Sequence, residues 1–240
     1  MLKAVFFDLY GTLAGFQPSR FDIQSRACAD FGITLTPEGV LRGYAVADAF
    51  MAKQNALAPL RNMADGEKRQ FFAEYERLVL KGSGVEVSTE QAEAIWRRVR
   101  QQRYDLMPFE DVRPTLTALR ERGLVVGMIS NMNRPAKALA EDLGLTPYLD
   151  FAVTSLEVGA EKPDPRIFHA ALSKAAVQPD EAMHVGDQPA SDVDGARAAG
   201  IAPVLLDRDR NHPSFTACPR IERLAELTVI LGAWQMQDAL

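Results

Sequence analysis

Residues 3–13 read KAVFFDLYGTL, and the first strand of the chain is expected within them. Its first part, residues 3–7, is a continuous run of largely apolar side chains that ends at Asp8, which is typical of a strand buried on both faces of a sheet. Three later runs have the same character and also end at polar or glycine residues. They are residues 124–129, 182–185 and 202–206. The sequence therefore predicts four buried strands.

Helical stretches alternate with these strands along the chain. They cover residues 112–122, 135–143, 165–176 and 190–199. Glycine, which commonly stops a helix, directly follows three of the four. Strand and helix in alternation predict an α/β fold, in which a doubly wound parallel sheet carries helices on both faces.

Residues 17–105 interrupt this alternation. Apolar side chains recur there at helical spacing and no strand run is evident, so about four inserted helices are expected. Trp96 is expected to pack in their core, while Arg97 and Arg98 belong to a solvated face. The predicted domains are a catalytic core of residues 1–16 and 106–240 and a helical cap of residues 17–105.

Composition narrows the class of protein. The chain has 240 residues, 47% of them hydrophobic, and a net charge of −5 from 27 basic and 32 acidic side chains. No basic run is present to neutralise a nucleic-acid backbone, so we expect a small anionic substrate and no nucleic-acid partner. The two cysteines, Cys28 and Cys218, lie far apart and suit a reducing compartment. The sequence shows no signal segment and no apolar run long enough to span a membrane, so we expect a cytoplasmic protein without a membrane partner. The sequence gives no indication of the oligomeric state.

Polar residues gather after the predicted strands. Asp8 follows the first strand, Ser130 and Asn131 the second, and Asp187 the third, with Asp192 five residues further on. In parallel sheets the ligand crevice lies at the carboxyl ends of the strands. A single acid there is often a turn residue, but several converging acids indicate a functional site.

These residues lie in four motifs with a recognisable order. DLYGTL at residues 8–13 closely resembles the first motif of the haloacid dehalogenase-like (HAD) hydrolase superfamily. Ser130-Asn131 is similar to the second motif, and SLEVGAEKPDPRIF at residues 155–168 to the third. HVGDQPASDVDGARAAG at residues 184–200 resembles the fourth. The resemblance implies a Rossmann-like core, and the place of the insertion is similar to the C1 cap of subfamily I.

The resemblance also implies a mechanism. Asp8 is the expected nucleophile, which forms a covalent intermediate that water hydrolyses. Lys162 would offset the repulsion between this carboxylate and an anionic substrate, and Ser130 would hold an oxygen of the transferring group. Tyr10 is the remaining catalytic candidate. The expected substrate-binding residues are Thr12, Asn131 and Arg42.

A metal site is implied by the first and fourth motifs together. In the phosphatase members, acids at the positions of Asp187 and Asp192 hold Mg²⁺ with the nucleophile, here Asp8. The backbone carbonyl of Tyr10 completes the expected ligand set, and this contact needs no particular side chain. The expected cofactor is therefore Mg²⁺, and the favoured function is a Mg²⁺-dependent phosphatase that acts on a small phosphate ester or acyl phosphate.

Tyr10 departs from the phosphatase pattern and keeps two alternatives open. Phosphatases carry a second acid there, which protonates the leaving group, whereas 2-haloacid dehalogenases carry tyrosine and need no metal. The fourth motif favours the phosphatase, because the dehalogenases lack the pair Gly186-Asp187. The insertion also lacks their Trp-Arg-x-x-Gln stretch. A weakly active binding member of the superfamily is the other alternative.

Overall fold

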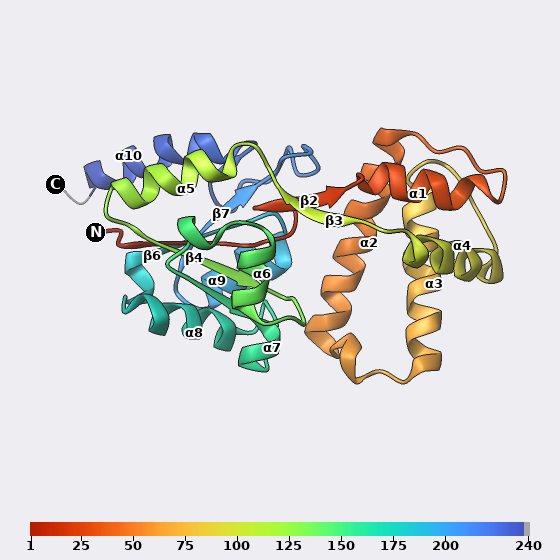
Figure 1. Cartoon of the computed structure of the whole chain (residues 1–240), viewed down its shortest axis with the longest axis horizontal. Coiled ribbons are helices and arrows are strands. Elements are labelled where there is room, and N and C mark those ends of the chain that lie inside the picture. The colour runs from red at the N-terminus through yellow and green to blue at the C-terminus, as the bar shows by residue number, and fades with distance from the viewer. Residues whose placement is uncertain (238–240) are drawn as a thin grey trace. The chain divides into compact units, whose positions relative to one another are not determined.

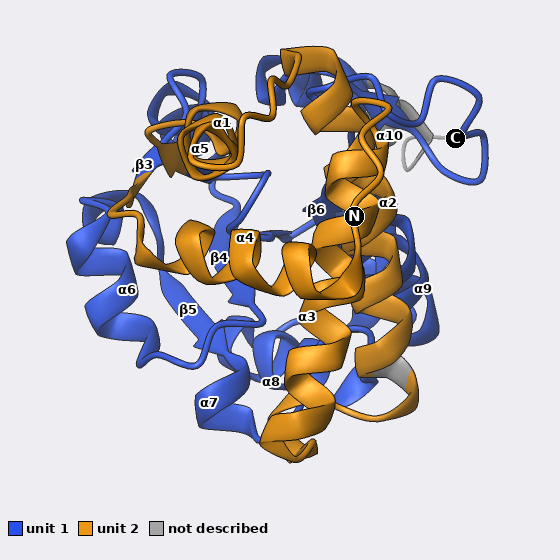
Figure 2. Cartoon of the chain, turned by 90° about the vertical axis from the view of Figure 1, so that its right-hand side faces the viewer, with its two compact units in different colours: residues 1–15, 107–240 blue, residues 16–106 orange. Residues whose placement is uncertain are grey.

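The computed structural model describes residues 1–237, with side chains for all of these except Ala56 and residues 233–237. The chain divides into two compact units, which Figure 2 colours separately. One, here the α/β unit, consists of Met1–Gly15 and Met107–Leu240. The other, the helical unit, consists of Phe16–Leu106.

A six-stranded sheet forms the centre of the α/β unit, with strand order β5-β4-β1-β6-β7-β8. All neighbouring strands in it are parallel. The strands are β1 (Ala4–Phe7), β4 (Val125–Ser130), β5 (Phe151–Thr154), β6 (Ala182–Gly186), β7 (Ala202–Leu206) and β8 (Arg220–Ile221). The order runs away from β1 in both directions, so the doubly wound arrangement has its switch point there.

Helices cover both faces of this sheet. They are α5 (Val112–Glu121), α6 (Ala136–Asp142), α7 (Ser155–Val158), α8 (Pro165–Ala175), α9 (Asp194–Ala198) and α10 (Leu227–Gln237). In Figure 1, α5 and α10 lie on one side of the strands and α8 on the other. All four residues of β1 are fully buried as a result, which explains why this strand is apolar at every position rather than at alternate ones.

The structure confirms the four expected strands and adds β5 and β8. β8 has only two residues, and the apolar part of β5 is residues 151–153, between Asp150 and Thr154, so neither was identified as a strand from the sequence. One expected helix is different: residues 190–199 do not form a single helix. A π-helical turn over Pro189–Val193 precedes the short α9 there.

Four helices build the helical unit, as expected. They are α1 (Arg20–Ala29), α2 (Pro37–Leu57), α3 (Asp65–Lys81) and α4 (Thr89–Gln101). Trp96 packs against their core and stacks on Phe72 with 4.7 Å between ring centroids, while Arg97 and Arg98 are exposed, which confirms both expectations. Where the chain passes between the units, β2 (Ala14–Gln17) and β3 (Asp105–Pro108) pair as a two-stranded sheet that the sequence did not predict.

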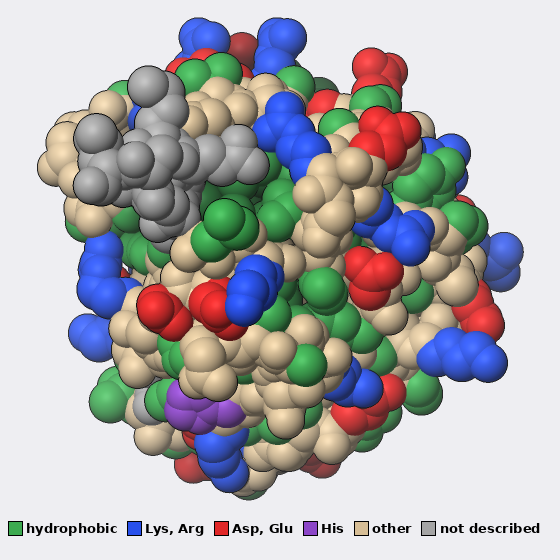
Figure 3. All heavy atoms as spheres, turned by 90° about the vertical axis from the view of Figure 1, so that its left-hand side faces the viewer, with side chains coloured by type: hydrophobic (Ala, Val, Ile, Leu, Met, Phe, Trp, Pro, Cys, Tyr) green, Lys and Arg blue, Asp and Glu red, His purple; other side chains and the backbone are tan. Residues whose placement is uncertain are grey.

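The surface carries charge of both signs. On the face of the molecule in Figure 3, acidic and basic side chains are interspersed and do not form a large patch of one sign. Among the helices described in residues 1–237, none is both long enough and apolar enough to cross a bilayer.

A buried glutamate lies in the middle of the helical unit. Glu76 on α3 is fully buried, and its Oε1 accepts a hydrogen bond from the amide of Gln24 on α1. Gln24 in turn accepts a hydrogen bond of 3.1 Å from the hydroxyl of Tyr44. Burial raises the pKa of Glu76 to about 8, against 4.5 for an ordinary glutamate, although the Gln24 hydrogen bond opposes the rise.

This pKa predicts a pH-dependent stability that Glu76→Gln removes. Between pH 4.5 and about 8 the native state holds the Glu76 proton while the unfolded chain releases it. The free energy of unfolding therefore falls as pH rises through this window, by up to about 1.4 kcal/mol per pH unit. Urea titrations at pH 5 and pH 8 measure the effect, and the glutamine variant is expected to lose much less stability than the wild type between them.

Glu74→Gln is the matched control, because Glu74 lies on the same helix with its side chain 46% exposed. It is expected to keep the pH dependence of the wild type. If Glu76→Gln kept that dependence too, Glu76 would be ionised in the native state at pH 5 and the assignment of a protonated buried carboxyl would be wrong.

Candidate active site

The strand ends bring separate parts of the chain to one edge of the sheet. Asp8 follows β1, and its N–H donates a hydrogen bond of 2.9 Å to the carbonyl of Val185 in the neighbouring β6. Ser130 is the last residue of β4 on the other side of β1, and its side chain is buried. Asp187 follows β6 directly. Since β4, β1 and β6 are adjacent and parallel, these polar residues share the carboxyl edge of the sheet.

Lys162 lies between two carboxylates at this edge. Its Nζ donates hydrogen bonds to Oδ1 of Asp8 and, over 2.6 Å, to Oδ1 of Asp192. The side chain of Lys162 is 3% exposed, and those of Asp8 and Asp192 are 10% and 1% exposed. Two buried carboxylates therefore share one buried ammonium group, and this trio carries a net charge of −1 when all three groups are ionised.

The three groups respond differently to this shared burial. Burial raises the pKa of Asp8 to about 6, helped by the negative charge of Asp192 and opposed by Lys162. Burial also acts to raise the pKa of Asp192, but Lys162 and His184 outweigh it and hold that pKa well below the usual range. For Lys162, burial alone would lower the pKa, yet the two carboxylates raise it above its usual value. Of the two carboxylates, Asp8 is therefore the less stabilised anion.

Three acids meet at one point in a way that could hold a cation. Carboxylate oxygens of Asp8, Asp187 and Asp192 lie within 4.8 Å of one another. A Cβ atom at Gly11 would lie 2.5 Å from Oδ2 of Asp187, so glycine is needed there for the Asp187 carboxylate to keep its place. Gly11 also has a φ of +81°, which favours glycine. Hard carboxylate oxygens in this arrangement fit Mg²⁺.

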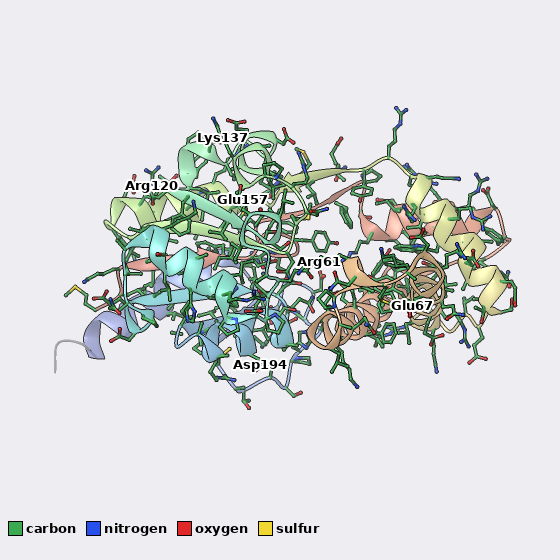
Figure 4. The ribbon with its side chains drawn as sticks, turned by 90° about the horizontal axis from the view of Figure 1, so that it is seen from below. Arg61, Glu67, Arg120, Lys137, Glu157 and Asp194 are labelled. Atoms are coloured by element: carbon green, nitrogen blue, oxygen red, sulfur yellow. The ribbon has the colours of Figure 1, made fainter. Side chains whose placement is uncertain are left out.

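Asn131 has a different contact from the one expected of it. Its amide group donates to the carbonyl of Lys162 over 3.0 Å, and its Oδ1 accepts from the N–H of Lys162 over 2.6 Å. The side chain therefore fixes the main chain of Lys162, and its predicted substrate contact stays a prediction. Nearby, Glu157 of α7, labelled in Figure 4, accepts a hydrogen bond of 2.9 Å from the first N–H of α6, at Ala136.

The other predicted residues lie in three different settings. Tyr10 is half-buried in the loop after β1, where it forms an isolated bridge with Ala14. Thr12 is fully buried, and its carbonyl accepts a hydrogen bond of 2.9 Å from Arg208. Arg42 belongs to the helical unit, is exposed, and donates over 3.0 Å to the carbonyl of Gly82. Their proposed roles in catalysis or substrate binding stay predictions.

Two residues that contact the acids were given no role from the sequence. His184 has its Nε2 3.0 Å from Oδ1 of Asp192, inside the sheet. Gln188 donates its N–H to Oδ2 of Asp192 over 3.0 Å and its side-chain amide to Oδ2 of Asp187 over 2.9 Å. For His184 the sequence did offer a signal, because a histidine inside an otherwise apolar strand is a buried polar group that requires a hydrogen-bond partner.

Comparison with known proteins identifies the family of this chain. A family model described as haloacid dehalogenase-like hydrolase matches residues 2–200, which is most of the chain and includes all four motifs. The chain belongs to the haloacid dehalogenase-like hydrolase family. It is thus a member of a family of hydrolases, and the aspartate, lysine and acid pair described above lie in the part that matches.

Individual relatives in this family differ in name and extent. A phosphoserine phosphatase of Thermus thermophilus is 34% identical, over 96% of this chain and 91% of that protein. Haloacid dehalogenase-like hydrolase domain-containing protein 3 of Mus musculus is 42% identical, but the match covers 54% of this chain and 53% of that protein. The match thus spans only about half the length of this mouse relative. A 2-haloacid dehalogenase structure from Pseudomonas syringae pv. Tomato has 25% identity and a TM-score of 0.57, over 98% of this chain and all of that one.

Proposed function

We propose that this HAD family member is a Mg²⁺-dependent phosphatase that uses Asp8 as its nucleophile. The observation that carries the proposal is the cluster of Asp8, Asp187 and Asp192 around one point, with Lys162 beside it. Three acids with one lysine leave an excess of negative charge, which a divalent cation offsets. A metal-independent dehalogenase has no evident need for the third acid.

The reaction proceeds in two displacements at phosphorus. An oxygen of Asp8 attacks the phosphoryl group, the bond from phosphorus to the ester or acyl oxygen breaks, and an aspartyl phosphate forms while the alcohol leaves as an alkoxide or the acyl group as a carboxylate. Water then attacks the same phosphorus, which releases inorganic phosphate and restores the Asp8 carboxylate. In this proposal Lys162, which bonds Asp8, offsets the repulsion between Asp8 and the substrate, and the hydroxyl of Ser130, the last residue of β4, donates to a phosphoryl oxygen.

The proposed ligands of Mg²⁺ are the side chains of Asp8, Asp187 and Asp192 and the carbonyl of Tyr10. The bound ion supplies charge neutralisation and orientation of the phosphoryl group. Lys162 and Gln188 hold the acids near one another and oriented before any substrate binds, because each of them donates hydrogen bonds to two acids at once. The helical unit is proposed to act as the cap, with Arg42 as a substrate contact.

The name of the Thermus thermophilus relative supports this choice, because that match extends over nearly the whole of both chains. We infer from it a small phosphate monoester as the substrate class, with an acyl phosphate as the other candidate. Phosphoserine itself is one compound to test within the first class.

The test is phosphate release from an aryl phosphate, measured with Mg²⁺ and again with excess chelator. Release that requires Mg²⁺ is expected, and it should return when Mg²⁺ is added back. Release of equal rate in chelator would contradict the metal-dependent mechanism. No release from aryl, alkyl or acyl phosphates would contradict the phosphatase proposal altogether.

A 2-haloacid dehalogenase is the second candidate, and Tyr10 is the observation that favours it, together with the likeness to the Pseudomonas syringae enzyme. Halide leaves carbon without needing a proton, so the missing acid would matter less. Halide release from a 2-chloro acid in the presence of chelator distinguishes this candidate, since the phosphatase is expected to give none.

Tyr10→Asp is expected to raise turnover of alkyl phosphates. An alkoxide leaves slowly unless it is protonated, and a positioned acid contributes about 10² to 10⁴ in rate. Aryl phosphates, whose leaving groups are better, are expected to gain much less. The measurement is kcat on an alkyl and an aryl phosphate for the wild type, Tyr10→Asp and Tyr10→Phe.

In the same comparison, kcat of Tyr10→Phe shows whether the tyrosine hydroxyl contributes to the rate. An unchanged or lower alkyl phosphate rate in Tyr10→Asp would count against the absence of an acid as the limiting feature of this site.

A further inference from the structure

His184 is a buried polar residue for which the mechanism above has no use. It lies in the middle of β6, between Met183 and Val185, and its side chain is completely buried. The Nε2 atom lies 3.0 Å from Oδ1 of Asp192. The ring forms a T-shaped pair with Phe168 of α8, with 5.1 Å between the ring centroids and 90° between the ring planes. The imidazole is therefore fixed in one orientation, with one nitrogen facing the carboxylate.

The geometry determines where the imidazole carries its proton. An ionised Asp192 can only accept hydrogen bonds, so a contact of 3.0 Å requires a hydrogen on Nε2. Among the described residues, Nδ1 has no hydrogen-bond partner. A proton on Nδ1 alone would bury an unpaired N–H and set the Nε2 lone pair against a carboxylate, which is unfavourable on both counts. The donor on Nε2 is present whether the ring is neutral or charged.

The strand explains why histidine is the residue at this place. His184 and Gly186 are two residues apart on β6, so they face the same side of the sheet. A Cβ at Gly186 would lie 2.2 Å from Cγ of Asp192, which means that Asp192 packs directly over this glycine. Asp192 itself comes from the π-helical turn over Pro189–Val193. The glycine makes room for the carboxylate, and the histidine reaches it from the same face of the strand.

We propose that His184 is a positioning residue, which fixes Asp192 by a hydrogen bond from Nε2 and so prepares the acid cluster for its cation. The inference rests on the proposed Mg²⁺ site. Oδ1 of Asp192 accepts from Lys162 over 2.6 Å and from His184, and Oδ2 accepts from the N–H of Gln188 over 3.0 Å. The carboxylate cannot turn without losing at least one of these bonds.

Without His184, Lys162 is the only side chain among the described residues with a hydrogen bond to Oδ1 of Asp192. Lys162 also bonds Asp8, so movement of Asp192 would also shift the ammonium group that lies next to the nucleophile Asp8. Hydrogen-bond partners of metal ligands commonly contribute about 10-fold to 100-fold to metal affinity or activity. His184 is expected to contribute in this range.

The test compares His184→Gln with His184→Leu. The glutamine amide reaches about as far as Nε2 and can donate to Asp192, whereas leucine fills similar space without a donor. Mg²⁺ affinity is measured by titration calorimetry on the protein without substrate, and the Mg²⁺ activation constant and kcat are measured separately. We expect the leucine variant to bind Mg²⁺ about 10-fold to 100-fold more weakly and the glutamine variant to stay within about threefold of the wild type.

Two results would overturn the proposal. One is Mg²⁺ affinity in His184→Leu equal to that of the wild type. The other is an equal loss in both variants, which would mean that the ring acts through packing against Phe168 and not through its donor. Thermal unfolding of both variants without Mg²⁺ shows whether each is folded.

A third measurement separates this proposal from the proposed function. Long-range ¹H–¹⁵N NMR spectra of the metal-free protein distinguish the two ring nitrogens, and the signals of His184 are those lost in His184→Gln. A proton on Nε2 is expected, and a proton on Nδ1 alone would overturn the hydrogen bond itself. This result does not depend on phosphatase activity, so a wild type that binds Mg²⁺ but releases no phosphate would refute the function and leave the positioning role intact.

Discussion

Asp8→Asn is expected to abolish phosphate release and to leave the protein at least as stable as the wild type. The activity is lost because an amide cannot replace the attacking carboxylate, and we expect a fall of about 10⁴-fold or more in kcat. The stability is kept because Asp8 is one of two buried carboxylates that share Lys162. Asparagine has nearly the same shape and still accepts a hydrogen bond from Lys162, while the trio changes from a net charge of −1 to a neutral pair.

The raised pKa of Asp8 predicts how the stability difference between Asp8→Asn and the wild type changes with pH. Because burial raises the pKa of Asp8 to about 6 from 3.8, the native state binds its proton more tightly than the unfolded chain does between these values. Ionised Asp8 therefore lowers the free energy of unfolding as pH rises through about 4 to 6, and the cost is fully present above pH 6. Asp8→Asn lacks this cost, so its advantage over the wild type should be larger at pH 7.5 than at pH 4.

Urea titration at pH 7.5 measures the stability of Asp8→Asn and the wild type, and phosphate release at the same pH measures their activity. Asp194→Asn is the control, since Asp194 lies on the surface at the start of α9 with its side chain 67% exposed (Figure 4). It is expected to change neither quantity much. A marked loss of stability in Asp8→Asn would show that the ionised Asp8 carboxylate stabilises the metal-free fold, which is the opposite of the effect expected from its raised pKa.

The sequence predicted the parts of the fold whose signal is local. β1 and β7 are continuous apolar runs because helices cover both faces of the sheet. β8 has only two residues and exists only through its pairing with β7, so it is too short to show a pattern. β5 is as long as β1, but it lies at the edge of the sheet, ends at Thr154 and is buried only at its last two residues, so it lacks the continuous buried apolar character of β1. The π-helical turn at Pro189–Val193 is equally hidden, because its residues have the composition of an ordinary helix start.

The candidate site also has parts that the sequence predicted and parts that only the structure shows. Asp8, Lys162, Asp187 and Asp192 lie in motifs with a fixed order, so their association was expected from the sequence. The hydrogen bonds of Asn131 to the main chain of Lys162 join residues 31 positions apart, and no pattern in the sequence indicates them. His184 lay inside a motif but looked like a strand residue, and only its distance to Asp192 shows its contact.

Lys162→Met is expected to remove activity and, unlike Asp8→Asn, to destabilise the protein. Methionine has similar length but no charge, so Asp8 and Asp192 would face each other, buried, without their shared cation. Loss of one partner from a buried ion pair costs about 3–5 kcal/mol of stability. The loss of a positioned cation near the transferring group is expected to lower kcat by about 10² to 10³ or more. Phosphate release and urea titration without Mg²⁺ measure both effects.

The double variant Asp8→Asn with Lys162→Met separates charge from shape. If repulsion between the carboxylates causes the instability, removal of one of them restores part of the lost stability, and the double variant is more stable than Lys162→Met alone. Lys174→Met, at an exposed lysine of α8, is the control and should keep both stability and activity. A double variant less stable than Lys162→Met would mean that the Lys162 side chain acts through packing and hydrogen-bond geometry, and that Asp8 is not a source of repulsion in the folded chain.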